Sequence, residues 1–291
     1  HHFLYEKASN AQKQHLMDDG NKLVDIGLDA ILATFGPDEK AVYNAALNYY
    51  RDSLIGKSLL EDLIGMRLSL KAQKSNTLKA DTNFTKMYIF YMNAFSPVFE
   101  KKLWPLIRSH NHLSIDRQLP IVKLLEDSTI LKIEEYAQEK WPTNEKVRID
   151  LTAYANWAGA YTPFGPDFNI IISSLDPAVE TSTFIEIVFH EGSHLLFGYG
   201  SSFRSALVLK SREMDREISR GLWHAAMFYM SGMEVKKQLE GIGKEHELNM
   251  IKRNIYQEFN NEEFRLTLDQ YMAGKIDLAS CAEKLILSVK E

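Results

Sequence analysis

Apolar residues recur at intervals of three and four positions along most of the chain, the spacing that places them on one face of an α-helix. In the first half this pattern predicts five helices, at residues 22–35, 38–51, 54–72, 85–95 and 121–138. No proline follows Pro177, and the pattern beyond it predicts three further helices, at residues 222–239, 251–272 and 275–290.

Two short β-branched runs interrupt the helical pattern. Residues 168–174 follow a Gly-Pro turn and form the best strand candidate in the sequence. Residues 147–151 form a second candidate, which we expect to pair with residues 169–173. The first run is either a buried structural strand or an edge strand that pairs with an extended peptide, and the sequence leaves both interpretations open.

The segment Thr183–Phe197 is predicted to be helical and contains the sequence His-Glu-Gly-Ser-His. His190 and His194 are four positions apart, so both imidazole rings lie on one helical face and can reach the same metal ion. Glu191 follows the first ring, where its carboxylate can serve as a general base toward water on that ion. Apolar flanks make these polar groups costly unless they have partners, which favours a metal centre over a core helix with hydrogen-bonded histidines.

A catalytic zinc ion normally takes three protein ligands. Three downstream residues compete for the third position, and all share one stripe if residues 213–229 are helical: His224, Glu217 and Glu213, in our order of preference. His224 is preferred because it is set among apolar residues, where an imidazole needs a partner. If a glutamate is the ligand, we expect His224 to donate a hydrogen bond to the developing oxyanion.

The motif, together with the strand candidate before it, resembles the zincin metallopeptidases over about residues 165–235. The resemblance implies a bound Zn²⁺ and a peptide or protein substrate. In that superfamily a strand runs along the substrate cleft ahead of the metal-binding helix. The corresponding substrate-binding side chains here would be those of Asn169, Ile171 and Ser173.

The spacing between His194 and Glu213 is similar to that of the gluzincin aminopeptidases, in which a glutamate on the next helix completes the site. The sequence around Glu213 does not repeat their Asn-Glu context. The resemblance therefore leaves the choice among the three candidates for the third ligand open.

Composition limits the classes of function. A formal net charge of −5 and a pI near 6.0 argue against general nucleic-acid binding, and no apolar run is long enough for a transmembrane segment. Cys281 is the single cysteine, which excludes an internal disulfide and a thiolate metal site. The chain begins with His1 and His2, which we exclude from site reasoning; removal of a signal peptide would fit a secreted or periplasmic enzyme, but the compartment stays open.

These patterns predict a mainly α fold (α+β), a helical bundle with a small β-sheet next to the metal-binding helix. We expect a helical N-terminal part over residues 1–145 and a catalytic part over residues 146–291, with one continuous domain as the alternative. The predicted function is that of a zinc metallopeptidase that cleaves peptide bonds with metal-activated water and Glu191. The alternatives are a catalytically silent zincin-like protein that binds peptides or partners, and a helical scaffold without metal.

Overall fold

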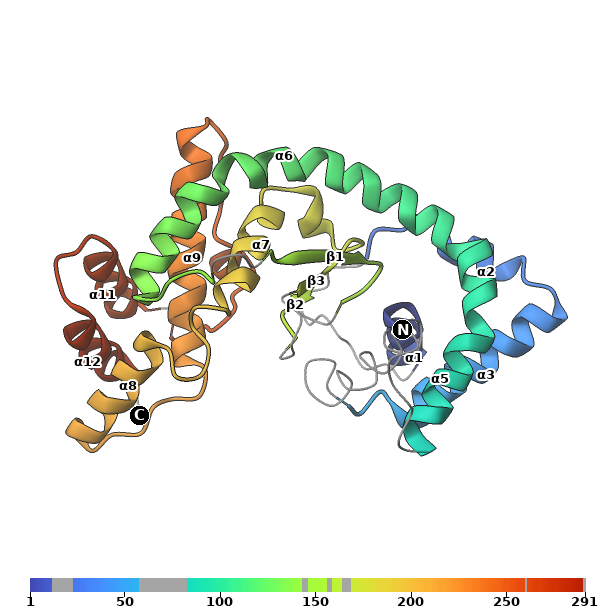
Figure 1. The fold of residues 1–291 in the computed structure, drawn as a ribbon, viewed down its shortest axis with the longest axis horizontal. Coiled ribbons are helices and arrows are strands. Elements are labelled where there is room, and N and C mark those ends of the chain that lie inside the picture. Colours follow the sequence, from blue (N-terminus) through green and yellow to red (C-terminus); the bar gives the residue numbers. More distant parts are fainter. Residues whose placement is uncertain are drawn as a thin grey trace. The chain divides into compact units, whose positions relative to one another are not determined.

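The computed structural model describes residues 1–11, 23–57, 83–142, 146–155, 159–163, 169–259 and 261–289. These residues are mainly helical and include a three-stranded mixed sheet, which confirms the predicted fold class (Figure 1). Among them, no helix combines the length and the apolar character that a membrane span needs.

The chain packs as two compact units. Unit 1 consists of His1–Asp116 and Val147–Val179, and unit 2 of Arg117–Lys146 and Glu180–Glu291. The chain therefore passes between the units three times, and one passage, after Lys146, lies close to the boundary predicted at residue 145. The division into a helical part and a catalytic part stays a prediction, because the units are defined by packing alone.

Unit 1 is built on helices from the first part of the chain. Its elements are α1 (His2–Ala11), α2 (Leu28–Ala33), α3 (Pro37–Ser53), α5 (Asn83–Val98), the π-helix η1 (Phe99–Leu103) and the first residues of α6 (Trp104–Ala137). Helix α3 starts with a proline at its first position, and the Glu39 carboxylate accepts a hydrogen bond from the Gly36 amide, an arrangement that fixes a helix start. The helix predicted over residues 54–72 lies mostly outside the described residues, and α1 was not predicted.

The sheet also belongs to unit 1. It consists of β1 (Arg148–Thr152), β2 (Ala160–Tyr161) and β3 (Asn169–Ser173), in the order β1-β3-β2. The predicted pairing is confirmed, since β1 lies parallel to β3 along five residue pairs. The interpretation of β3 as an edge strand is wrong, because β2 pairs antiparallel with its other side and all five of its residues are buried. Phe168, the first residue of the predicted run, lies outside the described residues.

Unit 2 contains the rest of α6 and the helices of the second half of the chain. These are α7 (Thr183–Ser193), α8 (Ser202–Met214), α9 (Leu222–Gly241), α10 (Asn249–Lys252), α11 (Glu262–Met272) and α12 (Leu278–Ser288), and the short 3-10 helix η2 (Pro177–Glu180) leads into them. Helix α7 packs along α9, and α8 and α11 pack against α12 (Figure 1). The helix predicted over residues 251–272 is wrong in its first half, because α10 ends at Lys252, turns follow it, and α11 begins only at Glu262.

Candidate metal centre

Helix α7 carries the first four residues of the His-Glu-Gly-Ser-His motif in a buried position, and His194 after it is half-buried. Every residue from Thr183 to Ser193 is buried, as the apolar flanks of the motif predict. The helix ends at Ser193, earlier than the predicted Phe197, and His194 is its C-cap. The backbone of His194 keeps helical angles (φ −55°, ψ −25°), so its ring still lies one turn beyond that of His190. The two rings meet edge to face, with 5.3 Å between their centroids and an interplanar angle of 81°.

His224 on α9 completes a group of three imidazoles. Its ring centroid lies 5.0 Å from that of His190 and 4.8 Å from that of His194. One nitrogen of each ring can be chosen so that all three lie within 4.8 Å of one another. The structure therefore brings together the two motif histidines and the preferred third candidate, from two helices that pack side by side.

The geometry of this group fits a metal ion. The Nε2 atoms of His194 and His224 are 3.1 Å apart. A tetrahedral zinc ion with Zn–N bonds of about 2.05 Å separates its ligand atoms by about 3.3 Å. The Nδ1 atom of His190 is buried without a hydrogen-bond partner among the described residues, which is costly for an imidazole nitrogen in a dry environment. Three imidazoles leave one position of a tetrahedral ion for water or substrate.

Burial keeps the three rings neutral. Desolvation lowers the pKa of His190 well below its ordinary value, with the nearby His224 adding to the shift. Burial also lowers the pKa of His194 to about 3 and that of His224 to about 4. The ring of Phe228 packs 4.2 Å from that of His190 and contributes to the apolar surroundings. Neutral imidazoles have a free lone pair at neutral pH, as metal ligands require.

Glu191 lies at the same site. Its side chain is nearly buried, and its Oε2 atom is 3.9 Å from the Nε2 atom of His194. Its charge acts on Tyr256, because Glu191 is among the groups that raise the pKa of that phenol. The carboxylate is therefore beside the three rings, where a general base toward metal-bound water has to be.

Tyr256 is a site residue that the sequence did not predict. Its hydroxyl group forms a hydrogen bond with Nδ1 of His224, on the side of the ring away from His194. Burial is the main cause that raises its pKa to about 12, so the phenol stays protonated at neutral pH. Its backbone is left-handed (φ 57°), which is unusual for a bulky residue and is found where surrounding structure imposes it.

The approach of Tyr256 depends on Gly221, the N-cap of α9. Gly221 has φ 96°, which disfavours any residue with a side chain, and a Cβ atom there would lie 3.3 Å from the Tyr256 ring. The glycine lets the chain turn into α9 just before His224 and leaves room for the phenol ring. No motif spacing could have indicated this, since Tyr256 lies in a turn segment predicted to be helical.

The two glutamates considered as third ligands lie elsewhere. Glu213 is on α8 with 61% of its side chain exposed and pairs with Lys210, and Glu217 is exposed in the segment between α8 and α9. The condition that residues 213–229 form one helix is not met, because the chain leaves α8 at Asp215, which has φ 51°. The stripe that joined the three candidates therefore does not exist.

The three residues expected to bind substrate are packed inside unit 1. The Asn169 side chain donates a hydrogen bond to the carboxylate of Asp150, and the Ser173 hydroxyl group donates one to the carbonyl oxygen of Ala153. Ile171 is buried. These contacts give the three side chains a structural role in the sheet, and their role toward substrate stays a prediction.

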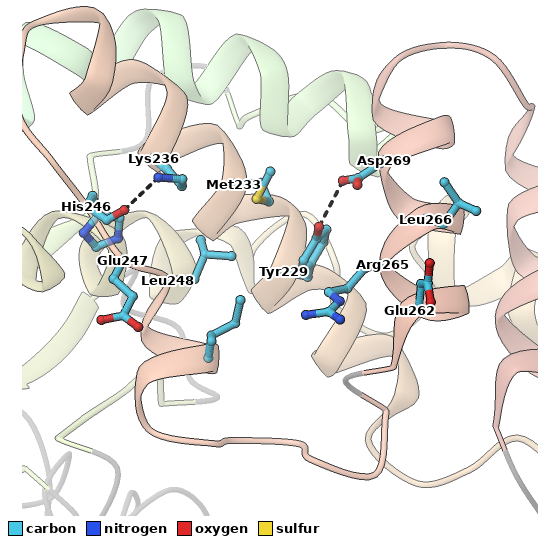
Figure 2. A pocket seen from close by; sticks show the side chains of 11 residues that line it. Tyr229, Met233, Lys236, His246, Glu247, Leu248, Glu262, Arg265, Leu266 and Asp269 are labelled. Carbon is cyan, nitrogen blue, oxygen red and sulfur yellow. Dashed lines mark hydrogen bonds between the residues drawn. The ribbon is translucent and has the colours of Figure 1, made fainter.

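A separate pocket of about 650 Å³ lies along a different face of α9 (Figure 2). Tyr229, Met233 and Lys236 project into it from α9, and residues of the α10 region and α11 form the rest of its wall. The Tyr229 hydroxyl group donates a hydrogen bond to Asp269 on α11. Neither the three histidines nor Glu191 line this pocket, so it is not the place where the metal chemistry would occur.

Comparisons with known proteins give no assignment. No protein-family model matches the chain, and neither a curated protein nor a solved structure shows significant similarity to it. The functional argument therefore depends on the site itself.

Proposed function

We propose that the protein is a zinc-dependent hydrolase that cleaves peptide bonds by the zincin type of mechanism. The observation that carries the proposal is the group of three neutral imidazoles beside a nearly buried carboxylate, with His190 and Glu191 adjacent in the chain. Imidazole nitrogens suit zinc, and three protein ligands with one open position are typical of catalytic sites.

A bound zinc ion would supply Lewis acidity and lower the pKa of a coordinated water toward neutrality. Residues of the chain would carry out the proton transfer and limit the access of water. Glu191 accepts the proton of the attacking water and passes it to the leaving amine. The apolar wall that includes Phe228 limits the access of other water, which strengthens the electrostatic interactions inside the site.

Tyr256 acts as a positioning residue in this proposal. If Nε2 of His224 binds the ion, Nδ1 carries the ring proton, and this N–H donates a hydrogen bond to the phenol oxygen of Tyr256. Such a second contact fixes the tautomer and the orientation of a metal-binding histidine. The phenol thereby holds the His224 ring in the orientation in which it could bind the same ion as His190 and His194.

The test combines metal content with turnover of a peptide library. We expect about one zinc ion per chain, and Glu191→Gln is expected to retain the metal while losing about a hundred-fold or more of the hydrolysis rate. Glu213→Gln is the matched control, since this exposed glutamate lies outside the site and its replacement is expected to change neither property. A protein that binds no zinc, or that hydrolyses peptides equally well without the Glu191 carboxylate, would contradict the proposal.

A further inference from the structure

A positively charged side chain lies beside the metal centre. Arg204 is in the first turn of α8, shortly after the segment that follows His194. Its guanidinium carbon lies 4.0 Å from the ring centroid of Tyr199 and 4.3 Å from that of Trp223. Both contacts are well within the range of cation–π attraction, so the two rings fix the position of the charge.

Trp223 connects this cation to the metal centre. Its indole ring lies 6.0 Å from the ring of His194 and 5.2 Å from that of His224, which it directly precedes in the chain. One aromatic ring thus separates the guanidinium group from two of the three imidazoles. Two or three residues of extended peptide, at about 3.4 Å per residue, cover such a span.

No oxygen acceptor among the described residues uses the hydrogen-bonding capacity of the Arg204 guanidinium group. Among the described residues, no carboxylate lies within ion-pair distance of its guanidinium group. Aromatic rings stabilise its charge but offer no oxygen acceptor to its planar set of N–H donors, which match a carboxylate in a bidentate way. Tyr199 has 84% of its surface exposed, so solvent reaches this cluster.

From this arrangement we infer that Arg204 forms a subsite that binds a carboxylate group of the substrate. The inference rests on the proposed function, because it takes the three histidines as the place where the peptide is cleaved. A C-terminal carboxylate and an acidic side chain have the same chemistry here, and either would lie within about three residues of the scissile bond. The Arg204 subsite, with its two aromatic rings, thereby selects acidic peptides over neutral ones.

The test measures binding rather than turnover. Glu191→Gln protein, with and without zinc, is titrated by calorimetry with N-acetyl tetraalanine as the free acid and as the amide. A second pair of amidated peptides differs by one internal glutamate or glutamine. We expect one acidic member to bind about ten- to a hundred-fold more tightly than its neutral partner, as for hydrogen bonds between charged groups, and the pair that shows this identifies the source of the carboxylate.

Adding Arg204→Gln to this background is expected to abolish the preference, and Arg204→Lys to retain only part of it. Arg212→Gln, at an exposed position on the same helix, is the matched control and is expected to retain it fully. Equal affinity of acidic and neutral peptides, including no binding of either, overturns the inference, as does a preference that survives Arg204→Gln. Because no step needs hydrolysis, an Arg204-dependent preference in a protein that cleaves nothing would contradict the proposed function and leave the subsite standing.

Discussion

His224 is held by contacts on both of its ring nitrogens. Nε2 faces His194 at 3.1 Å, and Nδ1 is bonded to the hydroxyl group of Tyr256. A left-handed backbone at a tyrosine costs on the order of 1–3 kcal/mol. The packing around Tyr256 offsets that cost and places a phenol where a metal-binding histidine needs its second partner.

Replacing Tyr256 with phenylalanine should weaken metal binding without removing a ligand. The ring of His224 then loses the contact that fixes its orientation, and we expect the dissociation constant for zinc to rise by about ten- to a hundred-fold. Competition with a chelating dye measures this constant. Tyr229→Phe is the matched control, since that hydroxyl group contacts Asp269 in the other pocket; an equal loss in both variants would argue against a specific role of Tyr256.

At the residue scale, the residues that could take part in chemistry were easier to predict from the sequence than the residues that hold them in position. His190, His194 and Glu191 were found by their spacing, and His224 by its apolar neighbours. Tyr256 is 32 positions from its partner, and nothing in its local sequence marks it. Contacts of this kind depend on tertiary packing, which single-sequence patterns do not contain.

Helices α7 and α9 approach each other closely at Gly232. A Cβ atom at this position would lie 2.8 Å from Oε1 of Glu186 and 3.0 Å from Cδ2 of Leu248. Glu186 cannot easily move away, because its other carboxylate oxygen accepts hydrogen bonds from the His246 ring and the Asn249 amide. Burial raises the pKa of this carboxyl, and the two bonds oppose that effect.

Gly232→Ala is therefore expected to destabilise the protein, even though alanine favours helices. We expect a loss of about 1–3 kcal/mol in the free energy of unfolding, typical of overpacking a buried contact. Denaturant unfolding checks this against Gly241→Ala, at the last residue of α9, where an added Cβ meets nothing within 4 Å. The control should be neutral or stabilised by up to about 1 kcal/mol; the same effect in both variants would contradict the close approach.

At the element scale, periodicity predicted most of the helices that flank the site, but not where they end. The chain leaves α8 at Asp215 and enters α9 after Gly221, and both residues have positive φ, so residues 213–229 do not form the single helix that would have aligned the three candidate ligands. The strand over residues 169–173 was recognised by its β-branched residues. Its central place in the sheet depends on the two-residue strand β2, which is too short to leave a pattern in the sequence.

At the scale of the whole molecule, the buried histidines link stability to pH. The folded-state pKa of His194 is about 3 and that of His224 about 4, below the ordinary value of 6.5. Between these values the unfolded chain binds protons that the folded chain does not. Stability is therefore fully present above pH 6.5 and falls as the pH decreases through this range.

Denaturant unfolding of the metal-free protein at several pH values tests this link. Each unmatched proton contributes a slope of at most about 1.4 kcal/mol per pH unit. The variant His194→Gln removes one of these groups, so its free energy of unfolding should decline less steeply below pH 6.5. A steeper decline in the variant, or parallel curves, would contradict the burial of a neutral ring at this position.

The three passages of the chain between the units also affect how the protein forms during translation. Unit 1 includes Val147–Val179, so it is complete only after residues 117–146 have left the ribosome without their partners from the later chain. The last of the three histidines is His224, and Tyr256, which contacts it, comes later in the chain. A nascent chain can therefore complete the three-histidine group only after residue 224 has been synthesised, and the contact with Tyr256 later still.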